Sequence, residues 1–150
     1  MAVLTLQGKV VIQGEARGRA LVSREPLSFW GGYDWKTGEI IDRRHMLSGS
    51  IARDRILAVP FTRGSSTTTA VLLEAIRAGT APAAIITTDT DFFFALASVV
   101  AEELYASPLP LVALSEIDFG RLRTGEEVRV MKDGRVIVGR KVESGKQKEY

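Results

Sequence analysis

The sequence of 150 residues contains no cysteine and a single histidine, His45. Without thiols the chain forms no disulfide and cannot hold an iron–sulfur cluster through cysteine ligands. One histidine also makes it a poor candidate for a zinc or di-iron protein. We therefore expect this chain to bind no metal ion through its own side chains.

Long hydrophobic runs and a strong charge of one sign are missing as well. No apolar run approaches the roughly 18 residues that span a bilayer, and the first six residues lack the basic region and long apolar core of a signal peptide. The formal net charge is only +2, which does not indicate a surface for nucleic acid. We expect a cytoplasmic protein that binds neither a membrane nor nucleic acid.

The composition is that of one soluble domain. Hydrophobic residues make up 45% of the chain and charged residues 25%, and a chain of this length can bury a core of its own. We expect the domain to cover residues 1–138. The polar residues 139–150 are interpreted as a solvated C-terminal tail, with a docking role as the alternative.

The middle third of the chain alternates between short apolar runs and helical patterns. It predicts buried strands over residues 56–59, 83–86 and 111–114, a helix over about 66–78, and a second helix that extends to about residue 104. Parallel strands joined by helices are the natural interpretation of this order. The fold class that we expect is therefore α/β.

Individual residues predict where these two helices begin and end. Gly79 is expected to close the first helix, and Asp89 or Asp91 to cap the N-terminus of the second. At least one ring of the Phe92–Phe94 run should point into the core. Four residues at helical spacing share one apolar face of the second helix: Phe93, Leu96, Val100 and Leu104.

Both ends of the chain add β structure. Strands are predicted over residues 10–12 and 20–22 near the N-terminus. Near the C-terminus, residues 128–131 alternate in polarity. A turn at 132–135 then leads into the apolar residues 136–138, and this order predicts a hairpin. The expected architecture is a small α/β core that carries additional strands from both ends of the chain.

An aromatic segment with two glycines, Phe29–Asp34, lies between the first strands and this core. Its rings either pack over the core or form an interface with a partner, where aromatic residues are enriched; both interpretations stay open. A turn at 36–38 leads into a short predicted strand at about 39–42. The polar residues 42–45 are expected to form an exposed loop, with contact to a ligand or partner as the alternative.

The most informative segment is Arg63–Thr69, between a predicted strand and a predicted helix. Gly64 is followed by five hydroxyl residues at a helix N-terminus, which offers free backbone N–H groups and a partial positive charge. Such a place suits a bound carboxylate or phosphate and favours a serine that has lost its proton. Since one serine also serves as an ordinary helix cap, the residues alone leave a small-molecule site and a plain cap both open.

This segment matches none of the common phosphate-binding or hydrolase motifs. It lacks the glycine-lysine pair of a Walker A loop, the G-x-G-x-x-G of a dinucleotide site and the G-x-S-x-G elbow. Ser65 has one possible histidine partner, His45, in a different segment. A Ser-His-Asp triad is therefore disfavoured.

Five segments of the chain, in order, carry a similarity to one enzyme family. They are Glu25–Asp34, Thr37–Asp42, Arg63–Ser66, Gly79–Ile86 and Pro108–Val112. Together they resemble the small subunit of the aconitase X family of dehydratases, over roughly residues 8–138. The resemblance implies a swivelling domain similar to that of aconitase, which is a three-layer β/β/α fold.

The same resemblance implies a role for the serine turn and for a partner. Ser65 would be the base that removes the α proton of a hydroxy acid, and Arg63, Gly64 and Ser66 would contact the substrate. A large subunit would pair with this chain as a heterodimer and hold the iron–sulfur cluster, whose iron would act as a Lewis acid on the departing hydroxyl. The chain would then be a hydro-lyase subunit that is active only in the complex.

Two branches of the family are open as substrates. One dehydrates cis-3-hydroxy-L-proline to an enamine that becomes 1-pyrroline-2-carboxylate, and the other dehydrates 5-phosphomevalonate. The Phe29-Trp30 pair and the unbroken hydroxyl run resemble the first branch, which is the activity that we expect. Thr67–Thr69 depart from the family pattern, where serine or glycine is usual, so a substrate other than these two is an alternative. A non-catalytic regulatory or binding module that holds an anion at the same helix end is a separate alternative.

Overall fold

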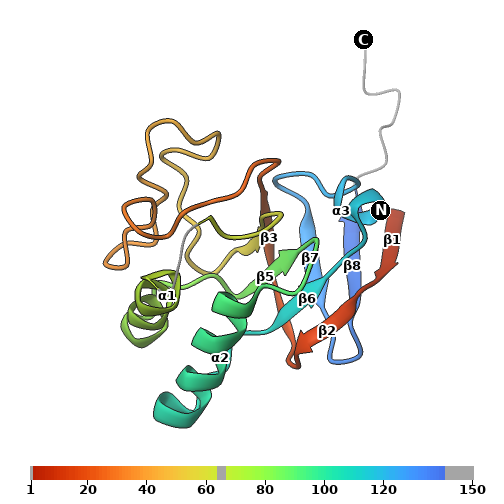
Figure 1. Ribbon diagram of the computed structural model, residues 1–150. Helices are drawn as coiled ribbons and strands as arrows, with labels where there is room; N and C mark the ends of the chain where they lie inside the picture. Colours follow the sequence, from red (N-terminus) through yellow and green to blue (C-terminus); the bar gives the residue numbers. More distant parts are fainter. Residues whose placement is uncertain (1, 64–66, 141–150) are drawn as a thin grey trace.

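The computed structural model describes residues 2–63 and 67–140 (Figure 1). Within these residues, strands and helices alternate through the middle of the chain, as predicted. In chain order the elements are β1 (Ala2–Gln7), β2 (Lys9–Ile12), β3 (Ala16–Val22), β4 (Ile56–Ala58), α1 (Thr67–Ala78), β5 (Ala84–Thr87), α2 (Phe92–Tyr105), β6 (Leu111–Ala113), α3 (Glu116–Phe119), β7 (Glu127–Val130) and β8 (Arg135–Arg140).

The strands form one mixed sheet in the order β1-β8-β7-β3-β4-β5-β6-β2. Neighbours from β3 to β6 are parallel, whereas β7, β8 and β1 extend the sheet in antiparallel fashion on one side and β2 on the other. Because β1 and β2 follow each other in the chain but lie at opposite ends of this order, the sheet curls into a half-barrel (Figure 1). A Cβ atom at Gly8, between them, would overlap the side chain of Val112.

Alternate residues of the parallel strands face two different cores, as the strand period of two requires. Leu21, Leu57 and Ile85 belong to the core beneath the helices. Their chain neighbours belong to the core between the two halves of the sheet: Ala20, Val22, Ile56, Ala58, Ala84 and Ile86. Helices, parallel strands and antiparallel strands therefore form three layers, which confirms the predicted α/β fold.

The predicted ends of α1 and α2 are correct. Gly79 follows α1 with a φ of +78°, the left-handed conformation of a C-terminal cap. The carboxylate of Asp91 caps α2 by accepting hydrogen bonds from the backbone N–H groups of Phe93 and Phe94. The two helices pack side by side over one face of the parallel strands (Figure 1).

The predicted apolar face of α2 is not the buried one. Its buried residues are Phe94, Ala97, Ser98 and Ala101, whereas Leu96 and Leu104 are exposed. Small side chains on the buried face let the helix approach the sheet closely, and Phe94 fills the space beneath the aromatic segment. The Phe92–Phe94 run does direct one ring into the core, as predicted.

Two stretches near the edges of the fold differ from prediction. Residues 2–7 form β1, which the sequence pattern does not predict; this strand pairs along its length with β8. Residues 39–42 do not form the predicted strand and make only isolated bridges, Tyr33 with Ile40 and Glu39 with Ile51. β8 continues beyond residue 138 to Arg140, and residues 141–150 of the expected tail lie outside the described part of the chain.

The aromatic segment packs over the core through two of its three rings. The ring of Phe29 is buried, stacks on Tyr33 at 4.8 Å between centroids and meets Phe94 edge-on at 5.3 Å. The Tyr33 hydroxyl donates to the carbonyl of Thr80 at 2.7 Å, and burial raises the pKa of this phenol far above its ordinary value. Trp30 is 70% exposed, so only this ring stays available for a partner.

Candidate functional site

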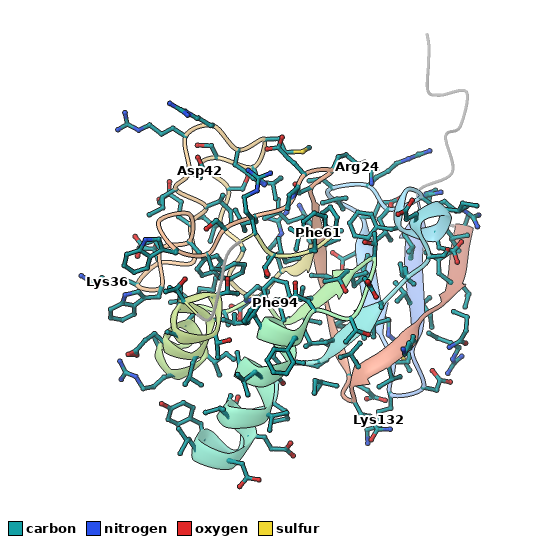
Figure 2. All side chains as sticks on the ribbon, in the orientation of Figure 1. Arg24, Lys36, Asp42, Phe61, Phe94 and Lys132 are labelled. Carbon is teal, nitrogen blue, oxygen red and sulfur yellow. The ribbon has the colours of Figure 1, made fainter. Side chains whose placement is uncertain are left out.

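The loops that follow the parallel strands meet at one edge of the sheet. In open α/β sheets this carboxyl edge is where ligands bind. Here the edge is formed by residues 23–26 after β3, residues 59–63 after β4 and residues 88–91 after β5. Arg24 and Asp42 lie along this side of the molecule, and Lys132 lies at the opposite end (Figure 2).

A pocket of about 530 Å³ opens at this edge. Two carboxylates and two guanidinium groups give its wall balanced charge, and a hydroxyl and an imidazole add further polar groups. The lining residues are Glu25, Pro26, Ser28, Asp42, Arg44, His45 and Arg63. The wall is therefore suited to a small ligand that carries charge of both signs.

Arg63 is the predicted site residue that lies in the described part of the chain. It is exposed at the pocket, and its backbone N–H donates to the carbonyl of Leu27 at 3.0 Å. The preceding N–H, of Thr62, donates to Oδ2 of Asp91 at 2.8 Å. The backbone just before the hydroxyl run is thus held by loops on both sides.

Residues 64–66, which include the predicted base Ser65 with Gly64 and Ser66, lie outside the described residues. Helix α1 begins directly after them at Thr67. Thr68 is buried, and its hydroxyl has no hydrogen-bond partner in the described structure. The hydroxyl of Thr69 donates to the carbonyl of Phe93 at 3.0 Å. Two of the five hydroxyl groups of the run therefore belong to the packing of α1 and not to the pocket.

His45 is buried, which contradicts the prediction that residues 42–45 form an exposed loop at every position. Its Nδ1 accepts a hydrogen bond from the Leu47 N–H at 3.1 Å. Because Nδ1 is the acceptor, we assign the neutral ring the tautomer that carries its proton on Nε2. Nε2 lies 3.2 Å from the Pro26 carbonyl and 3.3 Å from Oγ of Ser23. The hydrogen bonds of the ring join two loops of the pocket wall, and the ring is not arranged as the base of a triad.

The rest of that polar segment agrees better with prediction. Arg43 and Arg44 are exposed, and Oδ1 of Asp42 accepts from the Arg44 N–H at 3.0 Å. Asp42 and Arg44 line the pocket, as the alternative interpretation of this loop requires. Sequence reasoning did not single out Glu25 and Ser28; the available signal was their position just after a predicted strand.

The described residues form neither a metal centre nor a membrane-spanning helix. No group of three histidine, cysteine, aspartate or glutamate side chains among them is arranged to hold a metal ion, and the whole sequence has no cysteine. The side chains of this chain therefore do not fit an iron–sulfur cluster. In residues 2–63 and 67–140, no helix has the length and apolar character to cross a membrane.

Comparison with known proteins identifies relatives over most of the chain. A cis-3-hydroxy-L-proline dehydratase of Pseudomonas aeruginosa is 46% identical over 108 residues, which are 72% of this chain and 19% of that protein. A phosphomevalonate dehydratase small subunit of Methanosarcina acetivorans is 32% identical over 131 residues, which are 87% of this chain and 87% of that subunit. The chain thus spans about a fifth of the length of the first relative and most of the second.

A solved structure and a family description agree with these relatives. The crystal structure of Thermococcus kodakaraensis aconitase X in its holo form superimposes with a TM-score of 0.81 and 31% identity, and the match covers 91% of this chain and 99% of that chain. The description of the aconitase X swivel domain matches residues 5–138. The protein therefore belongs to the aconitase X swivel-domain family.

Proposed function

We propose that this chain is the small subunit of an aconitase X-type dehydratase. The observation that carries the proposal is the match to the aconitase X swivel domain over residues 5–138. Two of the relatives are named cis-3-hydroxy-L-proline dehydratase, and another is named a phosphomevalonate dehydratase small subunit. The position of the polar pocket at the carboxyl edge of the parallel strands supports a substrate site there.

In this proposal Ser65 is the base. Its oxygen, as an alkoxide, takes the proton from the substrate carbon next to the carboxylate. The electron pair of that C–H bond forms the C=C bond while the C–O bond to the hydroxyl breaks, and the hydroxyl leaves as water after taking up a proton. A free serine hydroxyl is too weak an acid for this role, but the N-terminus of α1 and the cation of Arg63 favour its ionised form.

Arg63, Gly64 and Ser66 contact the substrate in the same proposal. The guanidinium group of Arg63 is exposed at the pocket, and its fork of donors suits a carboxylate. Arg63, two residues before the base, would then hold the substrate carboxylate beside the carbon that loses the proton. Gly64 has no side chain to block that approach.

We infer cis-3-hydroxy-L-proline as the substrate from the charges of the pocket. This amino acid carries a carboxylate and a ring ammonium. Arg44 and Arg63 suit the first group, and Glu25 and Asp42 suit the second. A phosphate monoester has only negative charges, which the two carboxylates of the wall would repel. The identity of 46% to a cis-3-hydroxy-L-proline dehydratase supports the same choice.

Phosphomevalonate is the second candidate substrate. It is favoured by chain length, because the phosphomevalonate dehydratase small subunits are matched over 87% to 94% of their length. The cis-3-hydroxy-L-proline dehydratases are matched over only 19% and 21% of theirs. A direct comparison of the two substrates on the assembled enzyme separates these candidates.

The partner in this proposal is the large subunit, and any iron–sulfur cluster is held there, since this chain has no thiolate ligands. Such a cluster supplies Lewis-acid chemistry, and the steps assigned to this chain do not pass through it. The large subunit would cover the carboxyl edge, because the pocket lies there. Exposed apolar side chains follow three of the strands at this edge: Phe61, Phe92 and Ile117.

The test is an assay of the chain co-expressed with its large subunit. Dehydration of cis-3-hydroxy-L-proline and of 5-phosphomevalonate is measured for the wild type and for Ser65→Ala. We expect the variant to assemble but to lose turnover by roughly 10²- to 10⁴-fold, the contribution of a positioned base. Ser107→Ala, which changes an exposed serine in the loop before β6, is the matched control.

The outcomes of this assay are distinct. Ser65→Ala with near-normal turnover would place the base elsewhere. A complex that turns over neither substrate, together with strong thermal stabilisation of the isolated chain by a small anion, would favour the non-catalytic anion-binding module instead.

A further inference from the structure

The carboxylate of Asp91 serves two separate segments of the chain. Oδ1 accepts hydrogen bonds from the backbone N–H groups of Phe93 and Phe94, both at 3.1 Å, and so caps α2. Oδ2 accepts from the backbone N–H of Thr62 at 2.8 Å. The second bond joins the loop after β5 to the loop after β4.

The segment held by Oδ2 leads directly into the candidate site. Thr62 precedes Arg63, whose side chain lines the pocket. On its other side this segment is bound to the loop after β3, through a parallel bridge between Leu27 and Thr62 and the bond from the Arg63 N–H to the Leu27 carbonyl. The backbone of Thr62 and Arg63 is therefore hydrogen-bonded to the loop after β3 on one side and to Asp91 on the other.

The N-terminus of α2 also supports the chain after residues 64–66. There the hydroxyl of Thr69 donates to the carbonyl of Phe93, and Phe93 is itself bound by the Asp91 cap. Arg63 therefore directly follows a residue that is hydrogen-bonded to the cap of α2, and Thr67 lies two residues before one that is bonded to its first turn.

We propose that Asp91 is a positioning residue that acts through Thr62 to hold Arg63 at the pocket. The proposal rests on the proposed function, in which Arg63 binds the substrate carboxylate. The helix alone does not require a second oxygen. Ser115 caps α3 with a single hydroxyl, which accepts from the Asp118 N–H, and serine and asparagine are as common as aspartate at this position.

Asp91→Asn separates the two roles. The amide oxygen can still cap α2, but the other position then carries an NH₂ group that faces the Thr62 N–H, where two donors cannot bond. A flipped amide would keep one bond to Thr62 and lose the two to the helix. Asp89→Asn is the matched control, because it removes the same charge from an exposed carboxylate that bonds only the Thr90 N–H among the described residues.

The kinetic test uses the assembled complex and cis-3-hydroxy-L-proline. We expect Asp91→Asn to raise KM by about tenfold, the scale of one hydrogen bond to a charged group, with a smaller change in kcat. Asp89→Asn should leave KM unchanged. An equal rise of KM in both variants, or a loss confined to kcat in Asp91→Asn, would overturn the proposal.

A double-mutant cycle tests whether Asp91 acts through Arg63. If it does, adding Asp91→Asn to Arg63→Ala raises KM little beyond the single Arg63→Ala change, because coupled residues are non-additive. Multiplication of the two single effects would show that Asp91 does not act through Arg63.

Amide hydrogen exchange of the full chain tests the tie without any assay of activity. The Thr62 amide should exchange about tenfold faster in Asp91→Asn and at the wild-type rate in Asp89→Asn. Unchanged exchange of Thr62 in Asp91→Asn would refute the tie. If the wild-type complex lacks dehydratase activity while the Thr62 amide still exchanges faster in Asp91→Asn, the proposed function is refuted. The hydrogen bond between Asp91 and Thr62 is then established independently of it.

Discussion

The His45 ring connects two loops of the pocket wall. It accepts at Nδ1 from the Leu47 N–H and lies within hydrogen-bond distance of the Pro26 carbonyl and the Ser23 hydroxyl at Nε2. The ring is almost fully buried, with 7% of its residue surface exposed. Its bonds join the loop after β3 to residues 45–47, so we assign it a structural role in shaping the pocket.

Substitution of His45 should destabilise the isolated chain. His45→Ala leaves the Leu47 N–H and the Pro26 carbonyl without their partner, and we expect the free energy of unfolding to fall by about 2–3 kcal/mol. His45→Asn offers an amide oxygen close to the position of Nδ1 and should lose about half as much. Urea unfolding of the three proteins measures both differences; equal stability of the alanine variant and the wild type would contradict this role.

The hairpin of β7 and β8 is closed by an ion pair at its open end. Glu126 precedes β7, and Arg140 ends β8. Nε of Arg140 contacts Oε2 of Glu126 at 2.5 Å, and Nη2 contacts Oε1 at 3.2 Å. Hydrogen bonding from the Arg140 side chain lowers the pKa of the Glu126 carboxyl below its ordinary value of 4.5. The pair therefore stabilises the fold when the carboxylate is ionised.

The sign of this pKa shift predicts loss of stability in acid. A carboxyl group with a lowered pKa in the folded state stabilises the fold fully above its unfolded pKa, and this contribution is lost as the pH falls through the folded value. Glu126→Gln removes the ionisation. We expect the wild type to be more stable than the variant at pH 7, and the difference to shrink below about pH 4.5.

Urea unfolding between pH 7 and pH 3 measures that difference. Glu127→Gln is the matched control, because Glu127 is exposed and lies 3.9 Å from Arg19 in a weak surface pair. A difference between wild type and Glu126→Gln that does not vary with pH would contradict the shifted pKa.

The buried strands of the parallel half could be predicted because both of their faces are covered. β4, β5 and β6 are buried at every residue, so they read as continuous apolar runs in the sequence. β1 has one buried residue, Leu6, and it is held chiefly by pairing with β8. A strand that is held by backbone hydrogen bonds needs no regular pattern of apolar side chains, so the sequence does not predict it.

The orientation of α2 could not be predicted for a different reason. Its outer side carries Phe92, Leu96, Val99 and Leu104, all exposed. Since the helix is apolar on the outer side as well as the inner one, helical spacing does not identify the buried face. The pocket could be predicted only in part. The strand-turn-helix pattern of the sequence identified the loop that contains Arg63. Glu25 and Ser28 reach the pocket only because the parallel topology brings separate loops to one edge.

The complete fold places charged and apolar groups together at the carboxyl edge. The pocket is open there, and the loops beside it carry Phe61 (49% exposed), Phe92 (66% exposed) and Ile117 (82% exposed). Exposed apolar side chains that gather on one side of a molecule are typical of a surface that a partner covers. The opposite end of α2 also carries an exposed apolar residue, Leu104 (63% exposed), which serves as an apolar comparison away from this edge.

Association with the proposed large subunit should therefore depend on Phe61 and Phe92 and not on Leu104. We expect Phe61→Ser combined with Phe92→Ser to weaken binding by about tenfold or more, as loss of apolar contacts at the centre of an interface does. Leu104→Ser should have little effect, because α2 carries this residue about 18 Å along its axis from Phe92. Titration calorimetry with the purified large subunit measures each affinity, and thermal unfolding of the isolated variants checks that they fold. If Leu104→Ser weakens binding and the double phenylalanine variant does not, the partner covers the far end of α2 and not the carboxyl edge.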